Sequence, residues 1–206
     1  MSVLDTSIDL FNDNHKRNVY ENPLVSRYAS KEMNYIWSSN KKFTTWRKLW
    51  IYLAEGEKEL GLNISNEQLN EMKTFKSDIN YHIAEKKEKE VRHDVMSHVF
   101  AFGVQCPKAK NIIHLGATSC FITDNTELIQ LRDAMKLIQK KLLHTMKSLS
   151  TFCDKYKGLP TLGFTHYQPA QLVTVGKRAA LWLQDFLMDF HQLTSLIEQL
   201  PLRGIK

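Results

Sequence analysis

Glycine, proline and cysteine are all scarce in this 206-residue sequence, which holds 8 Gly, 5 Pro and 3 Cys. So little glycine and proline excludes a collagen-like chain, a flexible linker and a low-complexity segment. At the same time, 43% of the residues are hydrophobic and 10% are aromatic, which argues against a disordered chain. The length suits roughly one to one and a half ordinary domains, with enough residues for a sizeable core.

The three cysteines, Cys106, Cys120 and Cys153, are odd in number and show no Cys-x-x-Cys spacing. This argues against a disulfide framework and a zinc ribbon, and favours a reducing compartment. No apolar run approaches the roughly 20 residues of a membrane span. The N-terminal residues carry acids and lack a basic stretch followed by an apolar one, so no secretory signal is expected. We expect a soluble, cytoplasmic protein without a membrane partner.

A cationic excess of +6, from 28 basic and 22 acidic residues, fits an anionic partner without identifying it. Charge alone leaves open nucleic acid, a polyanionic small molecule, or a soluble protein with a modest cationic excess. The densest charge run, residues 85–90 (EKKEKE), has three residues of each sign. It therefore predicts a solvated helical face rather than a nucleic-acid patch.

A largely helical chain is predicted, because neither a sustained period-two alternation nor an Asn-Gly or Asp-Gly hairpin signal occurs. Residues 1–30 look irregular. A short helix should follow Ser30 as N-cap, and a second should run over about 44–60 until Gly61 ends it. In this second helix, helical spacing predicts ordinary core packing for Trp46, Leu49, Trp50, Leu53 and Leu60. Residues 65–68 (SNEQ) fit a capping box for a third helix.

Another helix is expected after Asp78, with an apolar stripe that continues unbroken over residues 91–102 until Gly103. A long helix is predicted between about Asp124 and Lys157. Nine positions there are spaced three or four residues apart, and eight of the nine carry apolar side chains. Such a helix spans roughly 50 Å and needs partners along its whole length.

A second long helix should follow a loop that ends near Gln171, and Pro201 and Gly204 should end it. Two such helices cannot fully cover each other's apolar stripes, so further helices or other copies of this chain must do so. The predicted fold class is all-α. We expect an N-terminal helical domain over residues 1–118 and an incomplete central long-helix bundle over 119–206.

The first segment suited to chemistry is residues 92–98 (RHDVMSH), which we expect to lie within one continuous helix. His93 and His98, five apart, would then point about 140° away from each other and could not easily share a metal ion. Arg92, His93 and Asp94 could bind phosphate or orient a proton carrier, but they could equally be ordinary surface charge.

The second segment, residues 112–120 (IIHLGATSC), leads into the long helix through small and hydroxyl-bearing residues. Free N–H groups and the positive dipole end make a helix N-terminus attractive to anions. Thr118 and Ser119 could therefore cradle a carboxylate or phosphate, or they could simply cap the helix.

The third segment, residues 162–171 (LGFTHYQPAQ), places Thr165 and Gln168 on either side of His166. An imidazole that titrates near neutrality and is held by hydrogen-bonding neighbours has what a general acid or base needs. A purely structural loop histidine is the alternative.

Taken in order, five stretches resemble the fumarase/aspartase superfamily, and closely the adenylosuccinate lyases of the animal type. They are NPLVSRYAS at 22–30, TWRKLW at 45–50, RHDVMSH at 92–98, IIHLGATSC at 112–120 and LPTLGFTHYQPAQ at 159–171. The G-x-T-H-x-Q pattern suits many members of the superfamily, whereas R-H-D-V-M and H-L-G-A-T-S narrow the likeness to the adenylosuccinate lyases.

The resemblance implies a fumarase/aspartase-like helical fold and elimination of fumarate from succinyl-AMP, giving AMP, and from SAICAR, giving AICAR, in purine nucleotide biosynthesis. It implies no metal, no organic cofactor and no nucleic acid. Both substrates carry a phosphate and two carboxylates, which gives the cationic excess a specific partner. The resemblance also implies a homotetramer whose active sites combine segments of several subunits.

The resemblance also implies roles for individual residues. His166 would be the general acid, with Thr165 beside it as a substrate-binding residue, and His93 would be both catalytic and substrate-binding. Further substrate-binding residues would be Arg92 and Asp94 beside His93, Thr118 and Ser119 at a carboxylate, and Arg27 and Tyr28 at the nucleotide end. His114 and Gln168 would be supporting residues.

The sequence also departs from the family pattern. In these lyases the base resembles a serine on a mobile glycine- and serine-rich loop beyond the G-x-T-H segment, and no such loop occurs in this sequence. Two hypotheses follow. The favoured one is the N-terminal portion of such a lyase, inactive on its own. The alternative is a non-catalytic, truncated helical module that associates with full-length subunits.

Overall fold

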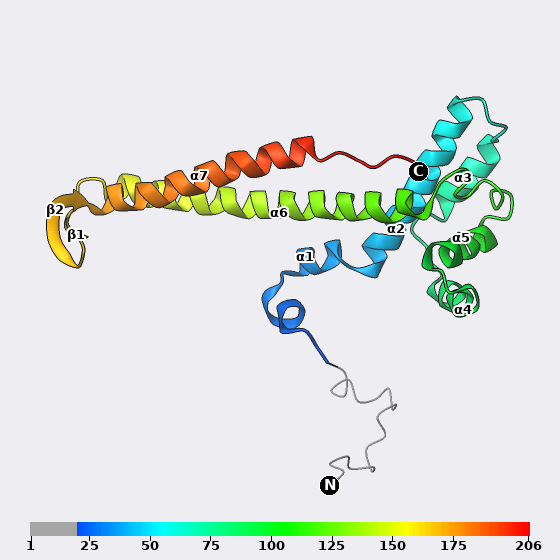
Figure 1. Cartoon of the computed structure of the whole chain (residues 1–206), viewed down its shortest axis with the longest axis horizontal. Helices are drawn as coiled ribbons and strands as arrows, with labels where there is room; N and C mark the ends of the chain where they lie inside the picture. The colour runs from blue at the N-terminus through cyan, green and yellow to red at the C-terminus, as the bar shows by residue number, and fades with distance from the viewer. Residues whose placement is uncertain (1–19) are drawn as a thin grey trace, which may run out of the picture.

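The computed structural model describes residues 20–206, which form a cluster of short helices joined to a long antiparallel helix pair (Figure 1). The cluster holds α2 (Ser39–Glu59), α3 (Asn66–Thr74), α4 (Tyr81–Val91) and α5 (Asp94–Gln105). The pair consists of α6 (Ser119–Lys155) and α7 (Val175–Gln199). A hairpin of β1 (Pro160–Thr165) and β2 (Gln168–Thr174) joins the pair at the end far from the cluster.

The segment before α2 contains a single π-helical turn, η2 (Leu24–Tyr28), and the short helix α1 (Lys31–Ile36). The all-α prediction is confirmed for the fold as a whole. The prediction of an irregular start is wrong for η2, and its part over residues 1–19 lies outside the described residues. The boundary proposed between residues 118 and 119 coincides with the start of α6, but the division into two domains stays a prediction.

Side-chain caps begin the early helices largely as predicted. Ser30 accepts a hydrogen bond from the backbone N–H of Met33 and caps α1, and the capping box of Ser65 and Gln68 begins α3. The second helix begins at Ser39 rather than near residue 44, because Ser38 caps a first turn of polar residues that carries no apolar period. Gly61, with φ of +96°, follows the end of α2 as predicted.

The prediction of one continuous helix through residues 92–98 is wrong. α4 ends at Val91, and Arg92 adopts a left-handed conformation with φ of 52°. α5 begins at Asp94, because the ring of His93 accepts the backbone N–H of Met96 where a Ser or Asp would normally act as the cap. The new helix also continues beyond Gly103 as far as Gln105.

The core of the cluster lies between α2, α5 and the beginning of α6. Trp46, Trp50, Phe102 and Ile122 are all almost completely buried there. Arg47 is buried with them, at 2% exposure, and its guanidinium lies 4.4 Å from the centre of the Phe102 ring. The burial of both tryptophans confirms the core predicted from helical spacing. The prediction is wrong for Leu60, which is 84% exposed at the end of α2, and the buried arginine was not expected.

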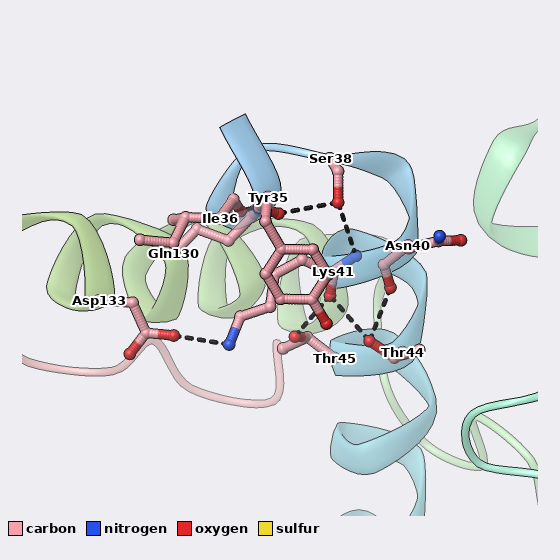
Figure 2. Close-up of polar contacts among 9 residues, drawn as sticks. All are labelled: Tyr35, Ile36, Ser38, Asn40, Lys41, Thr44, Thr45, Gln130 and Asp133. Carbon is pink, nitrogen blue, oxygen red and sulfur yellow. Dashed lines mark hydrogen bonds and ion pairs between the residues drawn. The ribbon is translucent and has the colours of Figure 1, made fainter. Parts of the chain in front are cut away.

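Polar contacts at the junction of α1 and α2 tie this cluster to α6 (Figure 2). Lys41 Nζ lies 2.6 Å from Asp133 Oδ2, and the side-chain amide of Gln130 donates to the carbonyl oxygen of Ile36 at 2.6 Å. Gln130 is only 4% exposed, so this hydrogen bond compensates for the burial of a polar group. The contacts fix where α6 leaves the cluster.

The stretch expected to be a loop ending near Gln171 is instead a two-stranded hairpin. Strand β1 pairs antiparallel with β2, from Pro160 opposite Thr174 to Thr165 opposite Gln168. The helix that follows begins at Val175, and Gly176 lies so close to the end of α6 that an added Cβ would be 2.6 Å from Lys157 N. This close approach holds the two long helices together beside the hairpin.

Large apolar side chains stay exposed along α7 and along the part of α6 nearer the hairpin, in line with the prediction that the two helices cannot cover each other. They are Ile138, Leu143, Phe152, Leu181, Trp182, Met188 and Leu196. A groove of about 780 Å³ between α6 and α7 is lined partly by Leu149, Phe152, Trp182 and Phe186. Within residues 20–206, no helix is both long and apolar enough to cross a membrane.

Candidate active site

His93 lies at the junction of α4 and α5, where its role as helix cap determines which ring nitrogen carries the proton. Its Nδ1 lies 3.4 Å from the backbone nitrogen of Met96, which can only donate. Nδ1 must therefore be an acceptor, and the neutral ring carries its proton on Nε2. Asp94 Oδ1 is 3.7 Å from the same Nδ1, too far for a hydrogen bond, and already accepts the backbone N–H of Val95 at 2.8 Å.

The proton on Nε2 of His93 faces the beginning of α6. Nε2 lies 3.4 Å from Ser119 Oγ, so His93 can donate to that hydroxyl. The preceding residue, Thr118, is the N-cap of α6, and its side chain makes no capping hydrogen bond. Two predicted site segments thus meet here, and they bring an imidazole N–H and two hydroxyls to the electropositive end of a 37-residue helix.

His114 lies in the turn before α6 and is joined to the core. It has φ of +65°, and its Nδ1 accepts the indole N–H of Trp50 at 3.0 Å. Burial, together with the neighbouring His93, lowers the pKa of His114 below its ordinary value. The neutral form of the His114 ring is therefore favoured.

His166 lies at the tip of the hairpin, at the other end of the long helix pair. Together with Tyr167 it forms the two-residue turn between the paired residues Thr165 and Gln168. The two turn residues have φ of 52° and 61°, as a type I′ turn requires, although that turn strongly prefers Asn and Gly. His166 is exposed, so a strained turn presents an imidazole beyond the end of the helices.

The two groups of candidate residues are far apart within one chain (Figure 1). The 37 residues of α6 separate Ser119 from the hairpin end, and at 1.5 Å per residue this corresponds to about 55 Å. His93, Thr118 and Ser119 therefore cannot act on the same small molecule as His166 of the same chain.

Arg27 and Tyr28 occupy a third place, in η2. Their side chains stack loosely, with the guanidinium carbon of Arg27 5.9 Å from the Tyr28 ring centre, and Tyr28 is 73% exposed. The turn is held to α1 by the side chain of Asn34, which donates to the carbonyl oxygen of Val25 at 3.0 Å. Arg92, by contrast, stands beside His93, as the left-handed residue that ends α4.

Sequence reasoning missed two residues near the turn that leads into α6, Trp50 and Glu57. They stand seven apart on α2, which places them on the same helical face, and both reach the turn that contains His114 and Gly116. Burial raises the pKa of Glu57. Their spacing in the α2 pattern was the available signal, but it indicates only a shared face and not what that face contacts.

The chemistry of the His93 end follows from its hydrogen-bonding groups. The N–H of His93, the hydroxyls of Thr118 and Ser119 and the helix N-terminus suit an anionic oxygen as ligand. Among residues 20–206, no cluster of three or more His, Cys, Asp or Glu side chains could hold a metal ion. The hairpin end, by contrast, offers an exposed imidazole suited to proton transfer.

Comparison with known proteins shows which family the chain belongs to. The family described as "Lyase" matches residues 28–205. Proteins named adenylosuccinate lyase from Schizosaccharomyces pombe and Saccharomyces cerevisiae are 48% and 50% identical over 190 residues, which is 91% of this chain and 39% of theirs. The chain thus spans about two fifths of the length of these relatives.

Solved structures share the fold. A 3-carboxy-cis,cis-muconate lactonizing enzyme from Pseudomonas putida superposes with a TM-score of 0.76 at 24% identity, over 87% of this chain and 42% of that one. A fumarate lyase from Mesorhizobium sp. BNC1 gives a TM-score of 0.74 at 22% identity, over 86% and 41%. At these identities the likeness concerns the arrangement of the helices.

Proposed function

Because the chain belongs to the lyase family, which it matches over residues 28–205, we propose that it is the N-terminal part of an adenylosuccinate lyase. The reaction would be the elimination of fumarate from succinyl-AMP to give AMP, and from SAICAR to give AICAR. The observation that carries this proposal is the identity of 48% and 50% to proteins of that name over 91% of the chain. A cytoplasmic setting, with Cys106, Cys120 and Cys153 kept reduced, suits it.

In this reaction a base removes a proton from the carbon next to a carboxylate, and the carbon–nitrogen bond then breaks as the double bond of fumarate forms. Negative charge collects on that carboxylate before the bond breaks, so its stabilisation lowers the barrier. The donors at the His93 end, with Thr118 and Ser119, suit this task. Arg92 and Asp94 would help to orient the substrate, and Arg27 and Tyr28 would meet the nucleotide.

The departing nitrogen needs a proton, and His166 is suited to supply it. Its ring stands at the tip of a strained turn, exposed to whatever occupies the space beyond the hairpin. Thr165 and Gln168 hold the ends of that turn by pairing with each other. The base would come from outside this sequence, on the loop that the family resemblance implies.

A complete site then requires more than one subunit. About 55 Å separates the His93 group from His166 along α6, so the two must come from different copies of the protein. The exposed apolar side chains of α6 and α7 offer the surface for such an assembly, and a homotetramer with shared active sites fits both features.

The test is a subunit-mixing assay of succinyl-AMP cleavage. We expect no fumarate from the chain alone. Mixed with full-length Saccharomyces cerevisiae adenylosuccinate lyase whose own histidine in the corresponding hairpin is replaced by alanine, the chain should restore fumarate release. His166→Ala in the chain should abolish this rescue, whereas His82→Ala, at an exposed position on α4, should leave it intact.

The outcomes separate the two hypotheses. Rescue that depends on His166 supports a catalytic contribution by this chain. Association by size-exclusion chromatography without rescue would favour the non-catalytic module that only joins full-length subunits. Fumarate release by the chain alone would contradict the view that the base lies outside it.

A further inference from the structure

The contact between Trp50 and His114 differs from ordinary core packing. Trp50 is 1% exposed, and its indole N–H finds its partner in the Nδ1 atom of His114, 3.0 Å away. An indole nitrogen can only donate, so Nδ1 must offer its lone pair. A neutral His114 then carries its single proton on Nε2, the ring nitrogen that does not face the indole.

We propose that Trp50 is a positioning residue of the active site, which holds His114 in the Nε2–H form and makes it a fixed hydrogen-bond donor beside His93. The value of such a donor for catalysis rests on the proposed function. The tautomer of the His114 ring does not rest on that function, because it follows from the contact with Trp50.

The backbone supports this role. His114 has φ of +65°, in the left-handed region that a non-glycine residue adopts at a cost, and such a conformation persists where its surroundings enforce it. The indole provides part of that enforcement: the two rings stand at 81° to each other with centres 6.1 Å apart. The strained turn thus places the imidazole against the one group that determines its proton position.

The consequence is a site whose two histidines are both donors. His93 has its Nδ1 occupied by the N–H of Met96, just as His114 has its Nδ1 occupied by Trp50. Neither ring presents a lone pair at Nε2, so neither can accept a proton there. The pair suits an anionic oxygen, and His114 is excluded as the base.

A neighbouring tryptophan provides a matched control. Trp46 lies one helical turn before Trp50, is 0% exposed, and its buried indole nitrogen has no hydrogen-bond partner among the described residues. Trp46→Phe and Trp50→Phe therefore remove the same group from the same core. Only the second substitution takes a hydrogen bond away from His114.

The experiment is ¹⁵N NMR of the histidine rings in the 206-residue chain, which distinguishes the two neutral forms and the imidazolium. We expect His114 as a single Nε2–H form at pH 7.5 in the wild-type chain and in Trp46→Phe. In Trp50→Phe, we expect a substantial Nδ1–H population and an upward shift of the His114 pKa. His93 and Glu57 face the same turn, so the ring of His93 is followed in the same titration and the carboxyl carbon of Glu57 by ¹³C NMR.

Two results would overturn the proposal. One is an Nδ1–H form of His114 in the wild-type chain, and the other is a Trp50→Phe chain whose His114 keeps the wild-type form and titration. Benzothienylalanine at position 50 retains the indole shape but lacks the N–H, and it gives the same reading if the phenylalanine variant does not fold. Because no substrate is present, failure of the lyase assay would leave this result unaffected.

Discussion

The buried ring of His98 should make the stability of the chain fall steeply in mild acid. The ring is 6% exposed and stacks on Phe43 with centres 3.8 Å apart. Burial and the nearby charge of Arg47 lower its pKa from 6.5 to about 4, while Asp94 opposes this shift and Lys42 adds to it. In the unfolded chain the same imidazole regains its ordinary affinity for protons.

The sign of the effect follows from these two values. Between pH 6.5 and 4 the unfolded chain binds a proton at His98 that the folded chain does not, so the stability that is full above pH 6.5 is lost as the pH falls. From pH 7 to pH 5, His98 alone should lower the free energy of unfolding by about 2 kcal/mol.

Urea unfolding at pH 7, 6 and 5, followed by tryptophan fluorescence, measures this slope, because Trp46 and Trp50 lie in the same core. His98→Gln removes the titrating ring, so the difference in stability between pH 7 and pH 5 should shrink by about 2 kcal/mol, whatever the substitution costs at pH 7. His82→Gln, at an exposed position, should keep the wild-type slope. A His98→Gln chain with the wild-type slope would refute the reasoning.

Three further predictions concern the core and the hairpin. Arg47→Met should cost about 3 kcal/mol in urea unfolding, because it leaves the carbonyl of Phe75 and Oε1 of Gln105 without their buried donor; a loss below 1 kcal/mol would show that water replaces it. Gly176→Ala should speed amide exchange throughout the hairpin, since its Cβ would meet Lys157 N at 2.6 Å. Tyr167→Gly should slow that exchange by relieving about 1 kcal/mol of left-handed strain, and unchanged exchange would mean that the turn is not strained.

Helix positions and caps could be predicted from the sequence because they depend on local chemistry. Ser30 and Ser65 cap α1 and α3 through their own neighbours, and the apolar period of the long helices is visible over many turns. The hairpin escaped detection for two reasons. Its turn is made by His166 and Tyr167 rather than Asn and Gly, and its strands are largely exposed, so the alternation of polar and apolar residues in β1 is short and does not continue into β2.

The candidate site shows the same limit. The motif around His93 could be recognised by its residues, but the break between α4 and α5 depends on Arg92 adopting a left-handed conformation that its side chain does not signal. Trp50 was assigned to the core from its spacing, and that assignment is confirmed. Its hydrogen bond to His114, 64 residues further along the chain, is a product of tertiary packing that no local pattern contains.

The length of α6 connects the fold to the proposed chemistry. One end of this helix carries Ser119 beside His93, and the other leads into the hairpin with His166, about 55 Å away. If the α6–α7 pairs of two copies packed antiparallel along their exposed apolar faces, the hairpin of one copy would lie at the His93 end of the other. The same apolar surface that an isolated chain leaves uncovered would then both hold the assembly together and complete the active site. A substitution that introduces charge at Ile138, exposed midway along α6, should therefore abolish assembly and rescue together, although it touches neither candidate site.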